Sequence, residues 1–77
     1  MPRFYFEVSC NEGVVRDEEG MDLPDVEAAE LDAKSTLADL AREAIDDPSL
    51  TAITINVLDA SRQVIFIAAM RFERRRN

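Results

Sequence analysis

The chain has no histidine, and only one cysteine and one lysine among its 77 residues. Without histidine, the Cys/His ligand sets of structural zinc sites are excluded, and a general base would have to be a carboxylate, a lysine or a tyrosine. The cysteine, Cys10, has acidic rather than cationic neighbours, which leaves its thiol poorly activated as a nucleophile. The lysine, Lys34, lies among acids. We therefore predict no catalytic residues, no cofactor and no metal centre.

Long apolar runs and glycine-rich loops are also missing. No stretch approaches the roughly 18 consecutive apolar residues of a membrane span, and the first residues, MPRFYFEVSC, contain no apolar signal region. The two glycines, Gly13 and Gly20, are too few and too isolated to form a phosphate-binding loop. The sequence thus predicts a soluble, cytoplasmic protein with a reduced thiol at Cys10 and no membrane partner.

What the chain does have is enough apolar material for one small core, since 47% of its residues are hydrophobic. We predict a single domain over residues 1–72 and a basic, disordered tail over residues 73–77. A monomer of this size buries only about 60% of the surface that its unfolded chain exposes. With neither a disulfide nor a metal to add stability, self-association is the expected supplement.

Charge is distributed unevenly along the chain. Residues 1–70 carry five basic and fifteen acidic side chains, whereas residues 71–77 carry four basic side chains and one acidic one. An acidic body repels nucleic-acid phosphates, so nucleic acid is not an expected partner of the body. The candidates for contact with a phosphate or with an acidic partner are therefore in the tail: Arg71, Arg74, Arg75 and Arg76.

The N-terminal part has the alternation of a half-buried strand. In residues 3–9, Phe4, Phe6 and Val8 fall on one side. Gly13 can take a positive φ in the turn that follows, and residues 14–17 then form a short second strand of a hairpin.

Between this hairpin and the next element lies an acid-rich stretch, RDEEGMDLPD, over residues 16–25. Asp22 can cap a helix and Pro24 fits its first turn, which gives the acids a structural role. Apolar residues then recur every three or four positions to about Asp46, as in an amphipathic helix of about six turns. A weak Ca²⁺ or Mg²⁺ site is the competing interpretation, with oxygen ligands from Asp17, Glu18, Glu19 and Asp22.

Residues 51–72 indicate two strands joined by a tight turn. A type I turn over Asp59–Arg62 with a bulge at Arg62 would pair Asp59 with Gln63 and Val57 with Ile65. That register places a first apolar row, Ile53, Ile55, Val57, Ile65, Ile67 and Ala69, beneath the helix. The predicted fold is α+β: an antiparallel four-stranded sheet packed on one long amphipathic helix, in the order ββαββ.

The same register leaves a second apolar row on the face that a single helix cannot cover. Exposed apolar patches with aromatic and methionine side chains are typical of interfaces. We therefore predict a homodimer through this face or through paired terminal strands, although a strand more apolar than necessary beneath a folded loop would also explain the pattern. The predicted interface residues are Leu58, Val64, Phe66, Ala68, Met70 and Phe72.

Four segments carry a resemblance to a known family: MPRFYF at the start, VVRDEEG followed by LPD, LAREAI at the end of the helix, and DASRQVI at the last turn. Together they resemble a family of short alphaproteobacterial proteins of unknown function, of the type found in rhizobial genomes. The resemblance covers nearly the whole chain and implies a bacterial ββαββ domain without an established activity. The family often has histidine where this chain has Glu7 and glycine where it has Arg62, so histidine chemistry is excluded here.

Two functions stay open at this point. The first is a small protein-interaction or scaffold module, self-associating through the apolar sheet face and able to bind another protein. The alternative is a nucleic-acid-associated regulator, in which Tyr5 and Phe66 stack on bases and the arginine-rich C-terminus binds phosphates.

Overall fold

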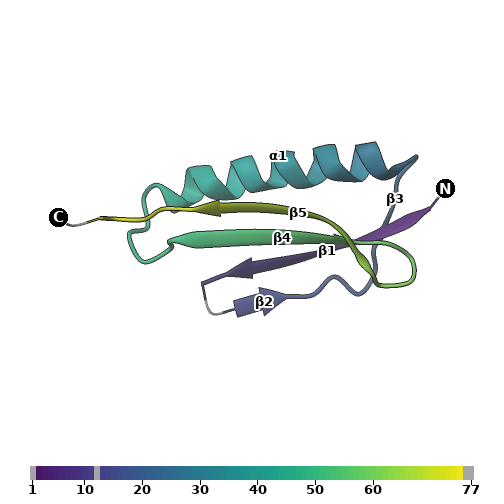
Figure 1. The fold of residues 1–77 in the computed structure, drawn as a ribbon, viewed down its shortest axis with the longest axis horizontal. Coiled ribbons are helices and arrows are strands. Elements are labelled where there is room, and N and C mark those ends of the chain that lie inside the picture. Colours follow the sequence, from purple (N-terminus) through teal and green to yellow (C-terminus); the bar gives the residue numbers. More distant parts are fainter. Residues whose placement is uncertain (1, 12, 76–77) are drawn as a thin grey trace.

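A computed structural model describes residues 2–11 and 13–75, and it contains one helix and an antiparallel sheet (Figure 1). The strands pair in the order β2-β1-β4-β5, and β3 pairs with the N-terminal end of β1. The α+β prediction is confirmed, with one addition, because β3 makes the order βββαββ. The elements are β1 (Arg3–Cys10), β2 (Gly13–Val15), β3 (Met21–Asp22), α1 (Val26–Ala44), β4 (Ala52–Leu58) and β5 (Val64–Arg71).

The core lies between the helix and one face of the sheet. Pairing of β1 with β4 sets Phe6 opposite Val57 and Val8 opposite Ile55, so the alternate apolar residues of both strands share a face. Ile53, Ile55 and Val57 are fully buried, as the pattern predicts. The central strand β4 therefore supplies the middle of the core.

Helix α1 runs along β4 and β5 (Figure 1). Ala29 and Ala33 face the sheet and are fully buried, which brings the helix backbone close to the strands. The predicted helix start at Asp22 is wrong. Asp25 is the N-cap, and its carboxylate accepts a hydrogen bond from the Ala28 amide at 2.9 Å. Asp22 lies instead in β3, where it pairs with Arg3.

The turn between β4 and β5 has the predicted form. The Arg62 amide donates to the Asp59 carbonyl at 2.9 Å, and the Asp59 amide donates to the Gln63 carbonyl at 2.9 Å. Arg62 takes a positive φ of 69° as the bulge residue. The Asp59–Gln63 pair of the predicted register is thus confirmed.

Beyond the turn the predicted register is wrong. Leu58 pairs with Val64 but Val57 pairs with Phe66, which leaves Ile65 unpaired as a β-bulge. One extra residue moves every following side chain to the other face. Phe66 and Ala68 therefore pack in the core beneath α1, and Ile67 lies on the opposite face.

Asn11 connects two distant loops. It takes the positive φ of the β1–β2 turn (46°), the role that the sequence analysis gave to Gly13. Its side-chain oxygen accepts hydrogen bonds from the amides of Thr51 and Ala52, both at 3.1 Å, and its side-chain amide donates to the Ser49 carbonyl. The connection between α1 and β4 is thereby fixed to the end of β1.

Candidate interaction surface

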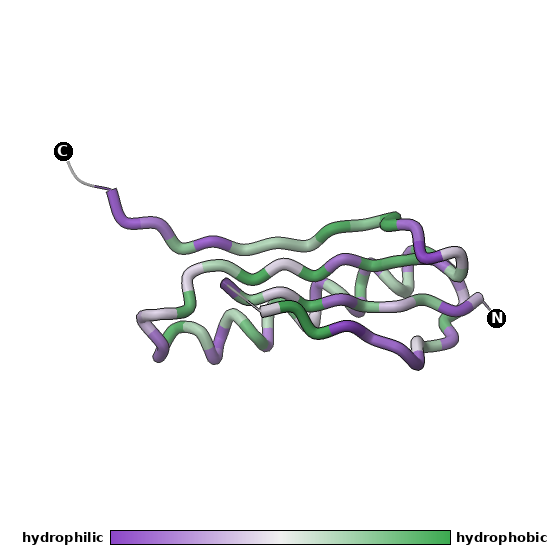
Figure 2. The backbone as a smooth tube through the Cα atoms, turned by 90° about the horizontal axis from the view of Figure 1, so that it is seen from below, coloured by the Kyte–Doolittle hydropathy of each residue, from purple (hydrophilic) through white to green (hydrophobic). Residues whose placement is uncertain are grey.

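Strand β5 ends the sheet on one side (Figure 2). Most of its residues are exposed, whereas most residues of β1 and β4 are buried or half-buried. It has eight residues, and residues 64–70, VIFIAAM, include no charged side chain. Three of its large apolar side chains are exposed: Val64 at 50%, Ile65 at 36% and Ile67 at 58%. The strand thus presents an apolar surface in a chain that is otherwise rich in acids.

The backbone of β5 is open along its outer edge. The Phe72 amide donates to the Thr51 carbonyl at 2.7 Å, so the Phe72 amide points toward the β4 side of the strand. Because amides alternate in direction along a strand, those of Met70 and Ala68 also face β4, and those of Ile67 and Ala69 face outward. Within the described residues, no other strand occupies this edge.

The opposite edge of the sheet is built differently. It consists of β2, with three residues, and β3, with two. Short edge strands, charges, prolines and covering loops are the usual ways in which proteins prevent pairing at an edge. From Val64 to Met70, β5 has neither a charge nor a proline.

The six predicted interface residues do not form one exposed row, which corrects the sequence-based prediction. Leu58 and Ala68 are buried, at 6% and 8% exposure. Phe66 packs against the core, and Met70 lies opposite Ile53 on the same face of the sheet. The physical reason is the bulge at Ile65, which turns Phe66, Ala68 and Met70 toward the helix. Of the six, Val64 and Phe72 are exposed, at 50% and 47%.

The face of the sheet away from the helix is polar at its centre. Glu7 pairs with Asn56, and Ser9 with Thr54. Arg62 lies over the Tyr5 ring, with its guanidinium carbon 3.8 Å from the ring centroid. One side of Tyr5 is thus covered and Phe66 faces the helix, so the two aromatic residues of the nucleic-acid hypothesis form no open stacking surface.

Three of the four candidate arginines lie in the described part of the chain. Arg71 and Arg75 both pair with the Glu73 carboxylate, each at 3.2 Å. Arg74 is exposed and has no hydrogen-bond partner among residues 2–11 and 13–75. Arg76 lies outside the described residues.

The acid-rich stretch forms a turn held by Asp17. The Asp17 carboxylate accepts hydrogen bonds from the amides of Gly20 (3.0 Å), Phe6 (3.2 Å) and Glu19 (3.2 Å). The pKa of Asp17 is lowered, first by the Gly20 amide and then, against the opposing effect of desolvation, by those of Phe6 and Glu19. No group of three or more potential metal-ligating side chains occurs in the part of the chain that the structure describes.

Asp17 makes the free energy of unfolding depend on pH in the acidic range. Its pKa is lower in the folded chain than in the unfolded one, so its contribution is complete above the unfolded value of about 3.9 and is lost as pH falls through the folded value. We expect Asp17→Asn to show a smaller loss of urea resistance between pH 5 and pH 2 than the parent protein, in circular-dichroism titrations at several pH values. Some acid sensitivity should remain, because hydrogen bonds from Arg3, Ser49 and Ser61 also lower the pKa values of Asp22, Asp47 and Asp59, respectively.

The control for this experiment is Glu18→Gln. Glu18 is the next residue along the chain and is exposed, and its carboxylate accepts no hydrogen bond from a described residue. This variant should keep the parental dependence on pH. An Asp17→Asn variant with the full parental acid sensitivity would show that the three amides do not stabilise the charged carboxylate.

Cys10 is the last residue of β1 and is half-buried. Among the described residues, no helix combines the length and the apolar character that crossing a membrane requires.

A comparison with protein-family models matched residues 3–71 to DUF6894, a domain of unknown function. Comparisons with curated proteins and with solved structures found no match.

Proposed function

The chain belongs to the DUF6894 family, a domain of unknown function, and we propose that it is a non-catalytic protein-interaction module that forms homodimers through β5. In this dimer, β5 of one copy pairs with β5 of the second copy, and the two sheets become one. Of the two modes of dimerisation predicted from the sequence, this proposal keeps the pairing of terminal strands and abandons contact through the apolar row.

A single observation carries the proposal: β5 is a long edge strand with outward-facing amides, exposed apolar side chains and no charge over residues 64–70. An edge of this kind is a template for another strand. Exposed Ile67 costs free energy in water, and burial against a second copy removes that cost. The opposite edge also exposes apolar side chains, at Val14, Val15 and Met21, but its strands have only three and two residues and so offer a much shorter ladder for pairing.

The second copy is the occupant that the surface fits best. Antiparallel pairing about a two-fold axis is self-complementary, so the outward-facing groups of Ile67 and Ala69 meet equivalent groups of the other strand. The middle of β5 is uncharged, and so pairing places no like charges directly opposite each other there. A chain of 77 residues without a disulfide also gains stability from the added burial.

Ile67→Lys tests the interface directly. Because Ile67 is 58% exposed, we expect the variant to fold, and its charge should oppose pairing with a second copy. Sedimentation equilibrium of the parent protein should give the mass of a dimer at about 100 μM. The dissociation constant of the variant should rise at least about tenfold, which corresponds to about 1.4 kcal/mol.

The matched control is Leu31→Lys, on the exposed side of α1, where leucine is 68% exposed. This variant should keep the parental mass. Ala69→Pro is a second test, since it removes an outward amide and proline is tolerated at edge strands. A parent protein that sediments as a monomer, or a dimer that survives both β5 substitutions, would contradict the proposal.

A further inference from the structure

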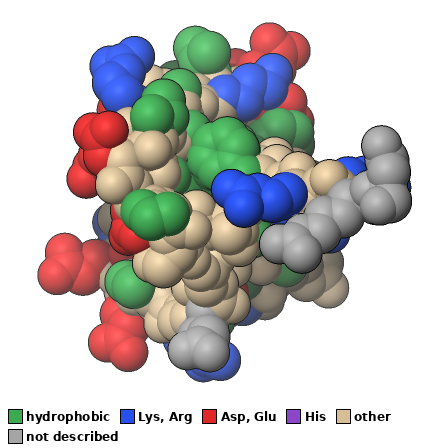
Figure 3. Space-filling model, turned by 90° about the vertical axis from the view of Figure 1, so that its left-hand side faces the viewer, with side chains coloured by type: hydrophobic (Ala, Val, Ile, Leu, Met, Phe, Trp, Pro, Cys, Tyr) green, Lys and Arg blue, Asp and Glu red, His purple; other side chains and the backbone are tan. Residues whose placement is uncertain are grey.

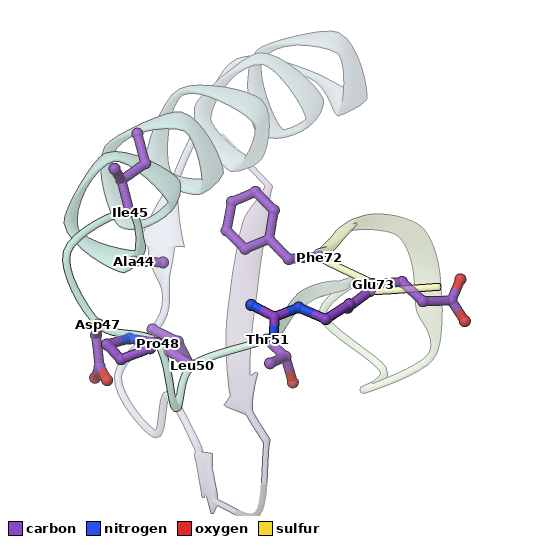
Figure 4. Close-up of a pocket in the computed structure, with 9 residues that line it drawn as sticks. Ala44, Ile45, Asp47, Pro48, Leu50, Thr51, Phe72 and Glu73 are labelled. Atoms are coloured by element: carbon purple, nitrogen blue, oxygen red, sulfur yellow. The ribbon is translucent and has the colours of Figure 1, made fainter. Parts of the chain in front are cut away.

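A groove of about 680 Å³ lies at one end of the molecule, away from the middle of β5 (Figure 4). Three segments form it: the end of α1, the connection between α1 and β4, and the residues that follow β5. The residues that line it include Ala44, Ile45, Pro48, Leu50, Phe72 and Arg74.

The groove contains the most exposed large apolar side chain of the described residues. Ile45 is 71% exposed and Phe72 is 47% exposed, although both are large. In Figure 4 the Phe72 ring lies across from Ala44 and Ile45, and the Glu73 carboxylate points away from them. A view of this end shows apolar side chains close to Lys and Arg side chains (Figure 3). Apolar surface gathered in a concave place is typical of a binding site.

The wall formed by the α1–β4 connection is held in place before any partner binds. The Asp47 carboxylate accepts hydrogen bonds from the Ser49 amide (3.0 Å) and the Ser49 hydroxyl (2.7 Å), and the Leu50 amide donates to the Asp47 carbonyl at 3.1 Å. Asn11 fixes the next residue, Thr51. A wall fixed in this way loses little entropy when a partner binds, which favours affinity.

Charge indicates which kind of partner the groove accepts. Of the two carboxylates that line it, Glu73 forms ion pairs with Arg71 and Arg75, whereas Asp47 accepts hydrogen bonds from Ser49 and keeps its negative charge. Arg74 lines the groove and has no hydrogen-bond partner among the described residues. A guanidinium without a partner beside an apolar surface is suited to a carboxylate next to an apolar group.

We propose that this groove binds a short peptide segment of another protein, one that presents a large apolar side chain beside a carboxylate. The apolar side chain contacts Ile45 and Phe72, and the carboxylate pairs with Arg74. The groove is partly open to solvent, so an extended peptide fits it better than a small molecule, which needs an enclosing pocket. The proposal does not depend on dimerisation through β5, because the two surfaces use different side chains.

The test uses a fluorescein-labelled octapeptide, Gly-Ser-Asp-Leu-Phe-Asp-Ser-Gly, in anisotropy titrations of the full chain. Saturable binding is expected, with a dissociation constant below about 1 mM. Replacing both aspartates of the probe by lysine, or its leucine and phenylalanine by serine, should weaken binding at least about tenfold. Because Ile45 is highly exposed, Ile45→Ser should fold and should weaken binding about tenfold. Arg74→Glu should also weaken it about tenfold.

Each variant has a matched control elsewhere on the surface. Leu31→Ser removes an equally exposed apolar side chain of α1, and Arg16→Glu reverses an exposed arginine between β2 and β3. Both should bind the probe like the parent protein. Any one of three results would overturn the proposal. These are no saturation of the probe by millimolar protein, a loss of affinity in the control variants equal to that in the test variants, or an unchanged affinity in both Ile45→Ser and Arg74→Glu.

Discussion

Replacing Ile55 by alanine is expected to lower the free energy of unfolding by about 2–5 kcal/mol. Ile55 is fully buried in the central strand, opposite Val8 of β1 and Ala68 of β5. Deleting three carbon atoms there leaves a cavity. The three strands and the helix around it cannot move inward enough to fill it, because they are held by their pairing and packing. A domain of this length has a total stability of only about 4–12 kcal/mol, so a large fraction of the molecules should unfold in mild urea.

The measurement is a urea titration followed by far-ultraviolet circular dichroism, with the midpoint and the slope fitted together. Ile45→Ala is the control, since it makes the same chemical change where the side chain is 71% exposed. Its effect should stay within about 0.5 kcal/mol. Equal effects of the two substitutions would show that β4 does not lie at the centre of the core.

Gly20→Ala should cause the second large loss. Gly20 has a φ of 77°, where a residue with a Cβ atom costs about 1–2 kcal/mol. A Cβ at this position would also lie 2.8 Å from Cε1 of Tyr5 and 2.9 Å from Cγ of Arg3. Both the backbone strain and the steric overlap destabilise the turn that Asp17 holds. The free energy of unfolding is therefore expected to fall by about 2–4 kcal/mol in total. Thermal unfolding should show it as a clear fall in Tm.

Gly13→Ala provides the matched control. An added Cβ at Gly13 meets no atom within 4 Å, and this glycine has no positive φ. The substitution should be neutral or stabilising by up to about 1 kcal/mol, because alanine has fewer unfolded conformations to lose. If Gly13→Ala destabilised the protein as much as Gly20→Ala, the backbone strain at Gly20 would not be the cause.

The sequence predicted those parts of the fold that depend on local patterns. Alternation identified β1 and the buried side of β4, and helical spacing identified α1. The turn at Asp59–Arg62 followed from residue types that favour one geometry. These signals work because neighbouring residues in the chain determine the structure on their own.

The face of β5 could not be predicted in the same way. Both of its rows are apolar, so the pattern does not indicate which row is buried. One unpaired residue, Ile65, decides between them. The small side chain of Ala68 fits beneath the helix close to the buried Ala29 and Ala33, which is a property of packing that periodicity does not contain.

The helix start shows a related ambiguity. Asp22 and Asp25 are both acceptable N-caps, and only the pairing of Asp22 with Arg3, nineteen positions away in sequence, separates them. The groove at the end of the molecule was also missed, because its walls come from residues 44–51 and from residues 72–74. The one available signal was Phe72, an aromatic residue directly before the arginines.

The position of β4 in the sheet has a consequence for synthesis on the ribosome. The strand that joins both halves of the sheet consists of residues 52–58, so a nascent chain that ends at residue 51 has no central strand. Until then the N-terminal hairpin and the helix lack the strand against which both of them mainly pack. Folding must therefore wait until translation has passed this strand, and any chaperone that shields the nascent chain would act on these earlier segments.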